Sequence, residues 1–170
     1  MITPEYCLTM AQYNRWMNRK LYAAAARLTD EQRKRDLGAF FKSIDGTLNH
    51  LLWGDSMWFG RFVGEQLASG KTDATMETDF SALRSRREAL DERILQWART
   101  VTPEWLAATL RWTSAMDGRV RELSLAVCVM QMFNHETHHR GQVTTLLKQL
   151  GIDPGETDLP WLPELNAVKE

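Results

Sequence analysis

The strongest constraint on the fold comes from residues 124–150, where apolar side chains recur at helical spacing. The stripe passes through Cys128, Met132, His135, His139, Val143, Leu146 and Leu150. Residues three, four and seven apart share one face of an α-helix, so this stretch predicts a long helix with one face in a core. Gly151 is placed to adopt the left-handed conformation that commonly ends a helix.

Three further stretches predict long helices, at residues 4–28, 41–63 and 80–100. The second and third carry apolar residues at spacings of three, four and seven, which places those residues on one helical face. The pattern lacks the alternation of strands and helices that builds a parallel sheet. We therefore expect a single all-α domain over residues 1–170, a four-helix bundle.

Capping residues mark two of the expected helix starts. Thr3 can cap free N–H groups, and Pro4 at the first helical position has no N–H to leave unpaired. Thr29 and Gln32 have the spacing of a capping box, which predicts a short charged turn between long helices.

A small β-hairpin is expected before the last long helix. Asp117 and Gly118 suit a tight turn, and they stand between the candidate strands 110–116 and 119–123. After the last helix, residues 152–170 contain three prolines, so we expect this segment to wrap around the bundle.

Charge and composition argue against several partners. Lys plus Arg is 21 and Asp plus Glu is 22, so the net charge of -1 creates no field that would attract nucleic acid or an anionic membrane. No stretch reaches the roughly 18 apolar residues of a membrane span, and residues 1–7 do not resemble a signal peptide. Cys7 and Cys128 are too few for a disulfide framework, so we expect reduced, buried thiols and a cytoplasmic protein.

The histidines carry the clearest chemistry. His135 and His139 are four residues apart and interrupt the core-facing stripe, so both imidazoles can reach one metal ion. Two buried rings need polar partners, and shared coordination would satisfy both. His50, in the middle of the second long helix, is the candidate third ligand. Three imidazoles would leave a coordination position open, as in catalytic sites, and would suit zinc or nickel.

The same segment also matches HExxH, the zinc-peptidase signature, with Glu136 as the potential general base. The longer metzincin signature fails, because Gln142 stands where its Gly is expected and Thr145 where its third His is expected. A peptidase would also need a sheet edge to hold an extended substrate. We therefore keep this interpretation as the weaker alternative.

Three segments together resemble the DinB-like family of helical-bundle metalloproteins. They are residues 134–142 (NHETHHRGQ), 46–50 (GTLNH) and 13–16 (YNRW). The first resembles the family's NHxxHHRGQ segment, and the others resemble its segments in the second and first helices. The likeness extends over nearly the whole chain.

The resemblance implies one divalent metal ion per chain, zinc or nickel, on His50, His135 and His139, commonly in a homodimer. Because relatives include thiol-dependent transferases and isomerases, we expect a metal-dependent thiol S-transferase or hydrolase acting with a low-molecular-weight thiol or another small molecule. The alternative is a non-enzymatic metal-binding stress or sensor protein. The motif leaves the roles of Glu136 and His138 open.

Three further residues are candidates for the substrate pocket. Trp16 and Trp53 lie within or next to the matched segments and are predicted pocket walls, although both could be ordinary core residues. Gln142 lies one turn beyond His139. It could contact a ligand, or it could hydrogen-bond a metal-binding histidine.

Overall fold

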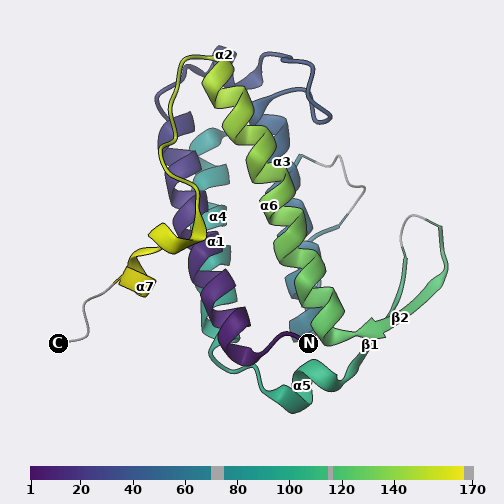
Figure 1. The fold of residues 1–170 in the computed structure, drawn as a ribbon. Coiled ribbons are helices and arrows are strands. Elements are labelled where there is room, and N and C mark those ends of the chain that lie inside the picture. Colours follow the sequence, from purple (N-terminus) through teal and green to yellow (C-terminus); the bar gives the residue numbers. More distant parts are fainter. Residues whose placement is uncertain (70–74, 115–116, 167–170) are drawn as a thin grey trace.

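Four long helices lie side by side and enclose the core (Figure 1). They are α1 (Pro4–Ala25), α3 (Ile44–Val63), α4 (Phe80–Ala98) and α6 (Leu125–Gln149). In this computed structural model, which describes residues 1–69, 75–114 and 117–166, α1 packs against α4 and α6, and α3 packs against the same two helices. The predicted four-helix bundle is confirmed.

Short elements connect these helices and follow them. They are α2 (Asp30–Lys34), α5 (Pro103–Ala107), β1 (Thr109–Thr113), β2 (Val120–Ser124), the 3-10 helix η1 (Leu159–Trp161) and α7 (Pro163–Asn166). The two strands project from the bundle beside the N-terminal end of α6 (Figure 1). In the described part of the chain, no helix is both long enough and apolar enough to cross a membrane.

The predicted helix boundaries hold where a capping residue marks them. The hydroxyl of Thr3 accepts the N–H of Tyr6 at 3.3 Å, and Thr29 forms a complete capping box with Gln32. Gly151 follows α6 with φ 75°, in the left-handed region. By contrast, the first helix ends at Ala25 rather than near residue 28, because no residue signals that end.

The predicted hairpin is present, but the expected two-residue turn at Asp117-Gly118 is wrong. The last pair of the antiparallel ladder is Thr113 with Val120, so the connection is longer. A carboxylate oxygen of Asp117 accepts the N–H of Arg119 at 3.2 Å, and Gly118 has φ 67°. The dipeptide is therefore one part of a wider loop. Residues 115 and 116, predicted as strand, lie outside the described residues.

The segment after α6 runs back along α1, as predicted. The hydroxyl of Tyr13 donates to the Thr157 carbonyl at 2.5 Å, and Arg15 pairs with Glu164 at 3.1 Å. Residues 167–170 lie outside the described residues. Both cysteines are free and buried, as expected for reduced thiols.

Candidate metal site

Three of the four histidines lie together between α3 and α6. His50 comes from α3, and His135 and His139 come from successive turns of α6. The Nε2 atom of His50 lies 2.9 Å from Nε2 of His135 and 3.2 Å from Nε2 of His139. One ring nitrogen from each residue lies within 4.8 Å of the other two. The packing of α3 on α6 therefore brings the distant histidine to the pair.

Two aromatic rings hold the plane of His50. Phe41 stacks on it with ring centroids 3.8 Å apart, and Trp53 lies nearly parallel at 6.0 Å. Phe41 also meets the ring of His139 edge-on at 5.5 Å. The sequence pattern did not indicate a role for Phe41, because it predicted a helix from residue 41, whereas α3 begins three residues later.

A tight turn before α3 delivers Phe41 to the site. Lys42 has φ 66°, a conformation that non-glycine residues rarely adopt. A side chain at position 46 would collide with the carbonyl oxygen of Phe41, so Gly46 lets the turn close against the helix. The glycine of the GTLNH segment thus has a direct packing role beside the histidines.

A glycine on α3 also makes room for His135. A Cβ atom on Gly54 would lie 2.6 Å from Cε1 of that imidazole, so the ring sits directly against the helix backbone. Burial, with a smaller contribution from His139, lowers the pKa of His135 to about 4. Its Nδ1 atom has no hydrogen-bond partner in the described part of the chain. The ring is therefore neutral near pH 7 and can offer a lone pair.

The orientation of His139 is fixed from the opposite side. Its Nδ1 atom lies 2.7 Å from Oε1 of Gln142, so Nδ1–H donates to the amide oxygen and leaves the Nε2 lone pair facing His50. Burial lowers the pKa of His139 as well, which favours the neutral ring. His138 is exposed and lies outside the cluster, with Gln142 at 3.4 Å. Of the two roles predicted for Gln142, the structure shows the contact to a histidine.

These features fit a divalent metal ion. Zinc binds imidazole nitrogens at about 2.0–2.1 Å, which places tetrahedral ligands about 3.4 Å apart. The observed spacings of 2.9 and 3.2 Å need to widen by only a few tenths of an ångström. Because burial keeps two of the rings neutral, their nitrogens are available as ligands. The group of His50, His135 and His139 could therefore hold a metal ion.

A second buried polar cluster, which we call the charge cluster, lies next to the histidines. Arg87 of α4 pairs with Asp55 of α3 at 2.8 Å and with Asp91 at 2.7 Å. It also lies 3.7 Å from Glu136 of α6, which pairs with Arg140 at 3.0 Å. All five side chains are almost completely buried. From sequence alone, charged residues are expected at the surface. Only Arg87, which stands in the apolar stripe of its helix, carries a sign in the sequence that it is buried.

The charges in this cluster balance if one carboxyl is protonated. Burial, reinforced by the charge of Glu136, raises the pKa of Asp55 well above its usual value. One oxygen each of Asp55 and Glu136 has no hydrogen-bond donor in the described chain, so a proton shared between them would satisfy both. With that proton, two guanidinium groups balance two negative charges in the cluster.

Residues of the first-helix segment complete the charge cluster. The side-chain oxygen of Asn14 accepts a hydrogen bond from Arg140, and its amide donates to Asp55 at 3.3 Å. The guanidinium of Arg140 also lies 5.1 Å from the ring centroid of Tyr13. The YNRW and HHRGQ segments are therefore linked through a buried network that joins α1, α3 and α6.

Glu136 belongs to this network rather than to the histidine group. Its side chain is 0% exposed and pairs with Arg140. Of the two ordinary roles expected for it, hydrogen-bonded and solvated, the structure shows the first. A general base must reach the proton that it removes, and this carboxylate faces two arginines.

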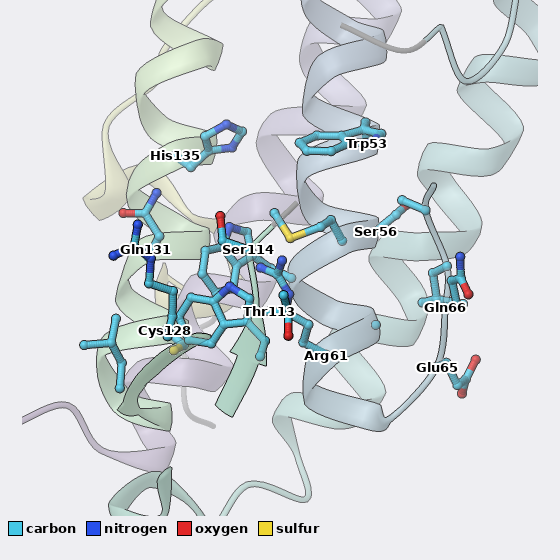
Figure 2. A pocket seen from close by; sticks show the side chains of 18 of the residues that line it. Trp53, Ser56, Arg61, Glu65, Gln66, Thr113, Ser114, Cys128, Gln131 and His135 are labelled. Carbon is cyan, nitrogen blue, oxygen red and sulfur yellow. The ribbon is translucent and has the colours of Figure 1, made fainter. Parts of the chain in front are cut away.

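A cavity of about 1420 Å³ opens beside the histidines. Its walls come from α3, α6, the stretch after α3 and both strands, and include His50, Trp53, Met57, Trp112, Gln131 and His135. Figure 2 shows His135 and Trp53 at one end of this cavity. Trp53, a predicted wall of the substrate pocket, thus lines this cavity.

The other two pocket candidates lie elsewhere. Trp16 packs beside Tyr13 and under the ammonium of Lys20 on α1, and it is not one of the residues that line the cavity. Gln142 lines a smaller hollow of about 370 Å³ together with His138. Of the three residues chosen for their proximity to the matched segments, Trp53 alone lines this cavity.

Fold and site together define a class of protein, a helical bundle with an internal three-histidine cluster beside an open cavity. The chain belongs to the DinB family, whose sequence profile matches residues 1–170. It is similar to Protein DinB of Bacillus subtilis strain 168, with 23% identity over 160 residues that cover 91% of each chain. The predicted family is confirmed.

A solved structure supports the fold. The crystal structure of a DinB-like protein from Bacillus cereus ATCC 10987 matches with a TM-score of 0.64 at 20% sequence identity. The match covers 91% of this chain and 97% of that chain. At this level of identity the likeness concerns the architecture.

Proposed function

We propose that the protein binds one divalent metal ion, zinc or nickel, through His50, His135 and His139, and uses it as a metal-dependent enzyme. The observation that carries this proposal is the convergence of three imidazole nitrogens, with His50 and His135 lining a large cavity. A closed structural site would have four protein ligands, whereas three would leave a position open toward the cavity. We propose a thiol S-transferase or a hydrolase as the reaction class.

When bound, such an ion lowers the pKa of a coordinated water or thiol and so supplies a nucleophile near neutral pH. The chain's own residues prepare the site for it. Gln142 holds the tautomer of His139, and Phe41 and Trp53 fix the plane of His50.

The peptidase alternative has less support. It needs Glu136 as a base near the metal, and that carboxylate is buried against Arg140 and Arg87. The non-enzymatic stress or sensor protein remains the second candidate. An enzyme would convert a substrate in the cavity, whereas a sensor would change only its stability or its assembly when metal binds.

A thiol-consumption screen tests the enzymatic proposal. Protein loaded with zinc or with nickel is incubated with a low-molecular-weight thiol and a panel of electrophiles, and free thiol is measured over time. A parallel panel of activated esters tests hydrolysis. We expect metal-dependent turnover that is lost in His50→Ala and kept in His138→Ala, because His138 lies outside the cluster. Metal binding without turnover in either panel would favour the sensor.

We also propose a homodimer, as the family resemblance implies, and a reducing cytoplasmic location, which suits the two free, buried thiols. Light scattering coupled to size exclusion measures the mass in solution directly. A mass near 19.6 kDa, that of one chain, would contradict the dimer.

A further inference from the structure

Arg61, near the C-terminal end of α3, lines the cavity and is held between two tryptophans. The guanidinium carbon lies 4.8 Å from the ring centroid of Trp58 and 5.2 Å from that of Trp112. The two indoles meet edge-on at 5.6 Å. Stacking on aromatic faces holds a guanidinium in place while leaving its N–H edge free to bind an anion.

The charge of Arg61 is not compensated in the described part of the chain, where no carboxylate lies within 4.0 Å of its guanidinium. Glu65, which also lines the cavity, pairs instead with Arg93 at 2.9 Å. Burial raises the pKa of the neighbouring Cys128 thiol, so that group stays protonated at neutral pH. Burial also lowers the pKa of Arg61, yet a guanidinium remains charged under these conditions.

Arg61 and His50 lie at opposite ends of one stripe along α3. Four of the α3 residues that line the cavity share one face of the helix. Counted from His50, Trp53 lies three residues along, Met57 seven and Arg61 eleven. Eleven residues of helix span roughly 16 Å between Cα atoms. Figure 2 shows Trp53 near His135, while Arg61 lies farther along the cavity, toward Cys128. A ligand that reaches both ends must be elongated.

We propose that Arg61 is the anion-binding residue of the cavity and that the ligand is an elongated molecule with a carboxylate at Arg61 and its reactive group at the histidines. The body of the ligand lies against Trp53 and Met57. This inference rests on the proposed function for the chemistry at the histidine end, but the binding of a carboxylate by Arg61 does not depend on the metal.

The charge count favours a carboxylate over a more highly charged anion. Among the charged side chains that line the cavity in the described chain, Arg121 pairs with Asp117 at 2.5 Å and Glu65 with Arg93. Glu122 of β2 adds one exposed carboxylate, so the lining offers an anion a single guanidinium without an ion pair, that of Arg61. One guanidinium balances one carboxylate and can bind both of its oxygens. A phosphate dianion would retain an excess negative charge in a half-buried setting.

Matched ligands test the proposal without the metal. The probes are 6-phenylhexanoate, 6-phenylhexanol and 6-phenylhexylamine, which share a body and differ in the charge of one end. Their dissociation constants are measured by calorimetry on metal-free protein that circular dichroism shows to be folded. We expect the carboxylate to bind about tenfold or more tightly than the alcohol, and the amine to bind most weakly.

Two variants assign that preference to a residue. Arg61→Gln should remove the difference between the carboxylate and the alcohol, while Arg121→Gln, in the same cavity wall, should keep it. A wild-type protein that binds the alcohol or the amine as tightly as the carboxylate would overturn the proposal, and this test needs no variant. A preference that survives in Arg61→Gln would also overturn it. Neither result changes whether the histidines bind metal, so the two proposals fail separately.

Discussion

Two polar clusters lie side by side in this bundle, and they satisfy their polar groups differently. In the charge cluster, Arg87 and Arg140 meet Asp55, Asp91 and Glu136, so donors and acceptors come from the protein itself. In the histidine group, one ring nitrogen from each of three imidazoles converges, and the group contains neither an arginine nor a carboxylate. The first cluster pairs cations with carboxylates of the protein itself, whereas the second consists of imidazoles alone, whose nitrogens fit a divalent metal ion.

This difference separates a structural role from a functional one. Buried ion pairs across α3, α4 and α6 fix how these helices pack, because displacing one helix would leave a charge unpaired. Imidazole nitrogens that converge beside a cavity suit the binding of a ligand instead. The charge cluster therefore holds α3 and α6 in the register that places His50 opposite His135 and His139.

The largest expected effect comes from breaking the charge cluster. Arg87→Met leaves the Asp91 carboxylate without its cation and removes a hydrogen-bond donor from Asp55, so the free energy of unfolding should fall by about 3–5 kcal/mol. Urea denaturation followed by circular dichroism measures this. Arg84→Met removes an exposed pair with Glu88 on the same helix and should cost less than about 1 kcal/mol. Equal losses in the two variants would remove the distinction between buried and exposed pairs.

The next effect is confined to the histidine group. In Gly54→Ala, the new methyl group would displace the ring of His135, so metal affinity should fall by about 10- to 100-fold. Calorimetric titration with zinc measures it. Gly141→Ala is the control, because a Cβ there meets no atom within 4 Å and alanine favours the helix. Unchanged affinity in Gly54→Ala would show that the position of this ring does not matter.

A pH series tests whether the charge cluster holds a proton. Because the folded pKa of Asp55 is raised, its contribution to stability is complete below the unfolded value of about 4 and is lost as pH rises toward the folded value. Asp55→Asn keeps a neutral side chain and cannot titrate. Relative to wild type, its stability in urea should therefore improve between pH 5 and 8.

The exposed variant Asp153→Asn serves as the control for that series. Hydrogen bonding to Lys148 lowers the pKa of Asp153, so its own transition lies below pH 5 and the slope above should match wild type. If Asp55→Asn instead loses stability relative to wild type as pH rises, Asp55 is ionised in the folded protein and the charge balance described above is wrong.

The smallest expected effect concerns the turn that carries Phe41. Lys42 has φ 66°, so Lys42→Gly should stabilise the protein by about 1 kcal/mol, while Lys42→Ala should leave stability nearly unchanged. Thermal unfolding of metal-free protein measures both variants. No gain in the glycine variant would show that this backbone conformation carries no strain.

Sequence patterns predicted the bundle and the histidine spacing because both depend on local periodicity. The i, i+4 spacing of His135 and His139 places them on one face, and the capping signals at Thr3 and Thr29 depend only on near neighbours. The family resemblance supplied the link to His50. These features did not require knowledge of how the helices pack.

What the patterns missed depends on contacts between distant segments. Glu136 and Asp55 look like surface residues in sequence, and only the packing of α4 brings Arg87 to them. The cavity wall formed by Trp112 depends on where the hairpin folds. Phe41 reaches His50 only because Lys42 adopts a left-handed conformation, which no local signal predicts for a lysine.

The most direct test of the account is the metal content of the protein, purified without a histidine tag and measured by elemental analysis. We predict about one zinc or nickel ion per chain in wild type and in His138→Ala, and loss of that ion in His50→Ala and in His135→Ala. Metal retained in His50→Ala, or absent from wild type even after anaerobic reconstitution, would contradict the assignment of the three histidines as a metal site.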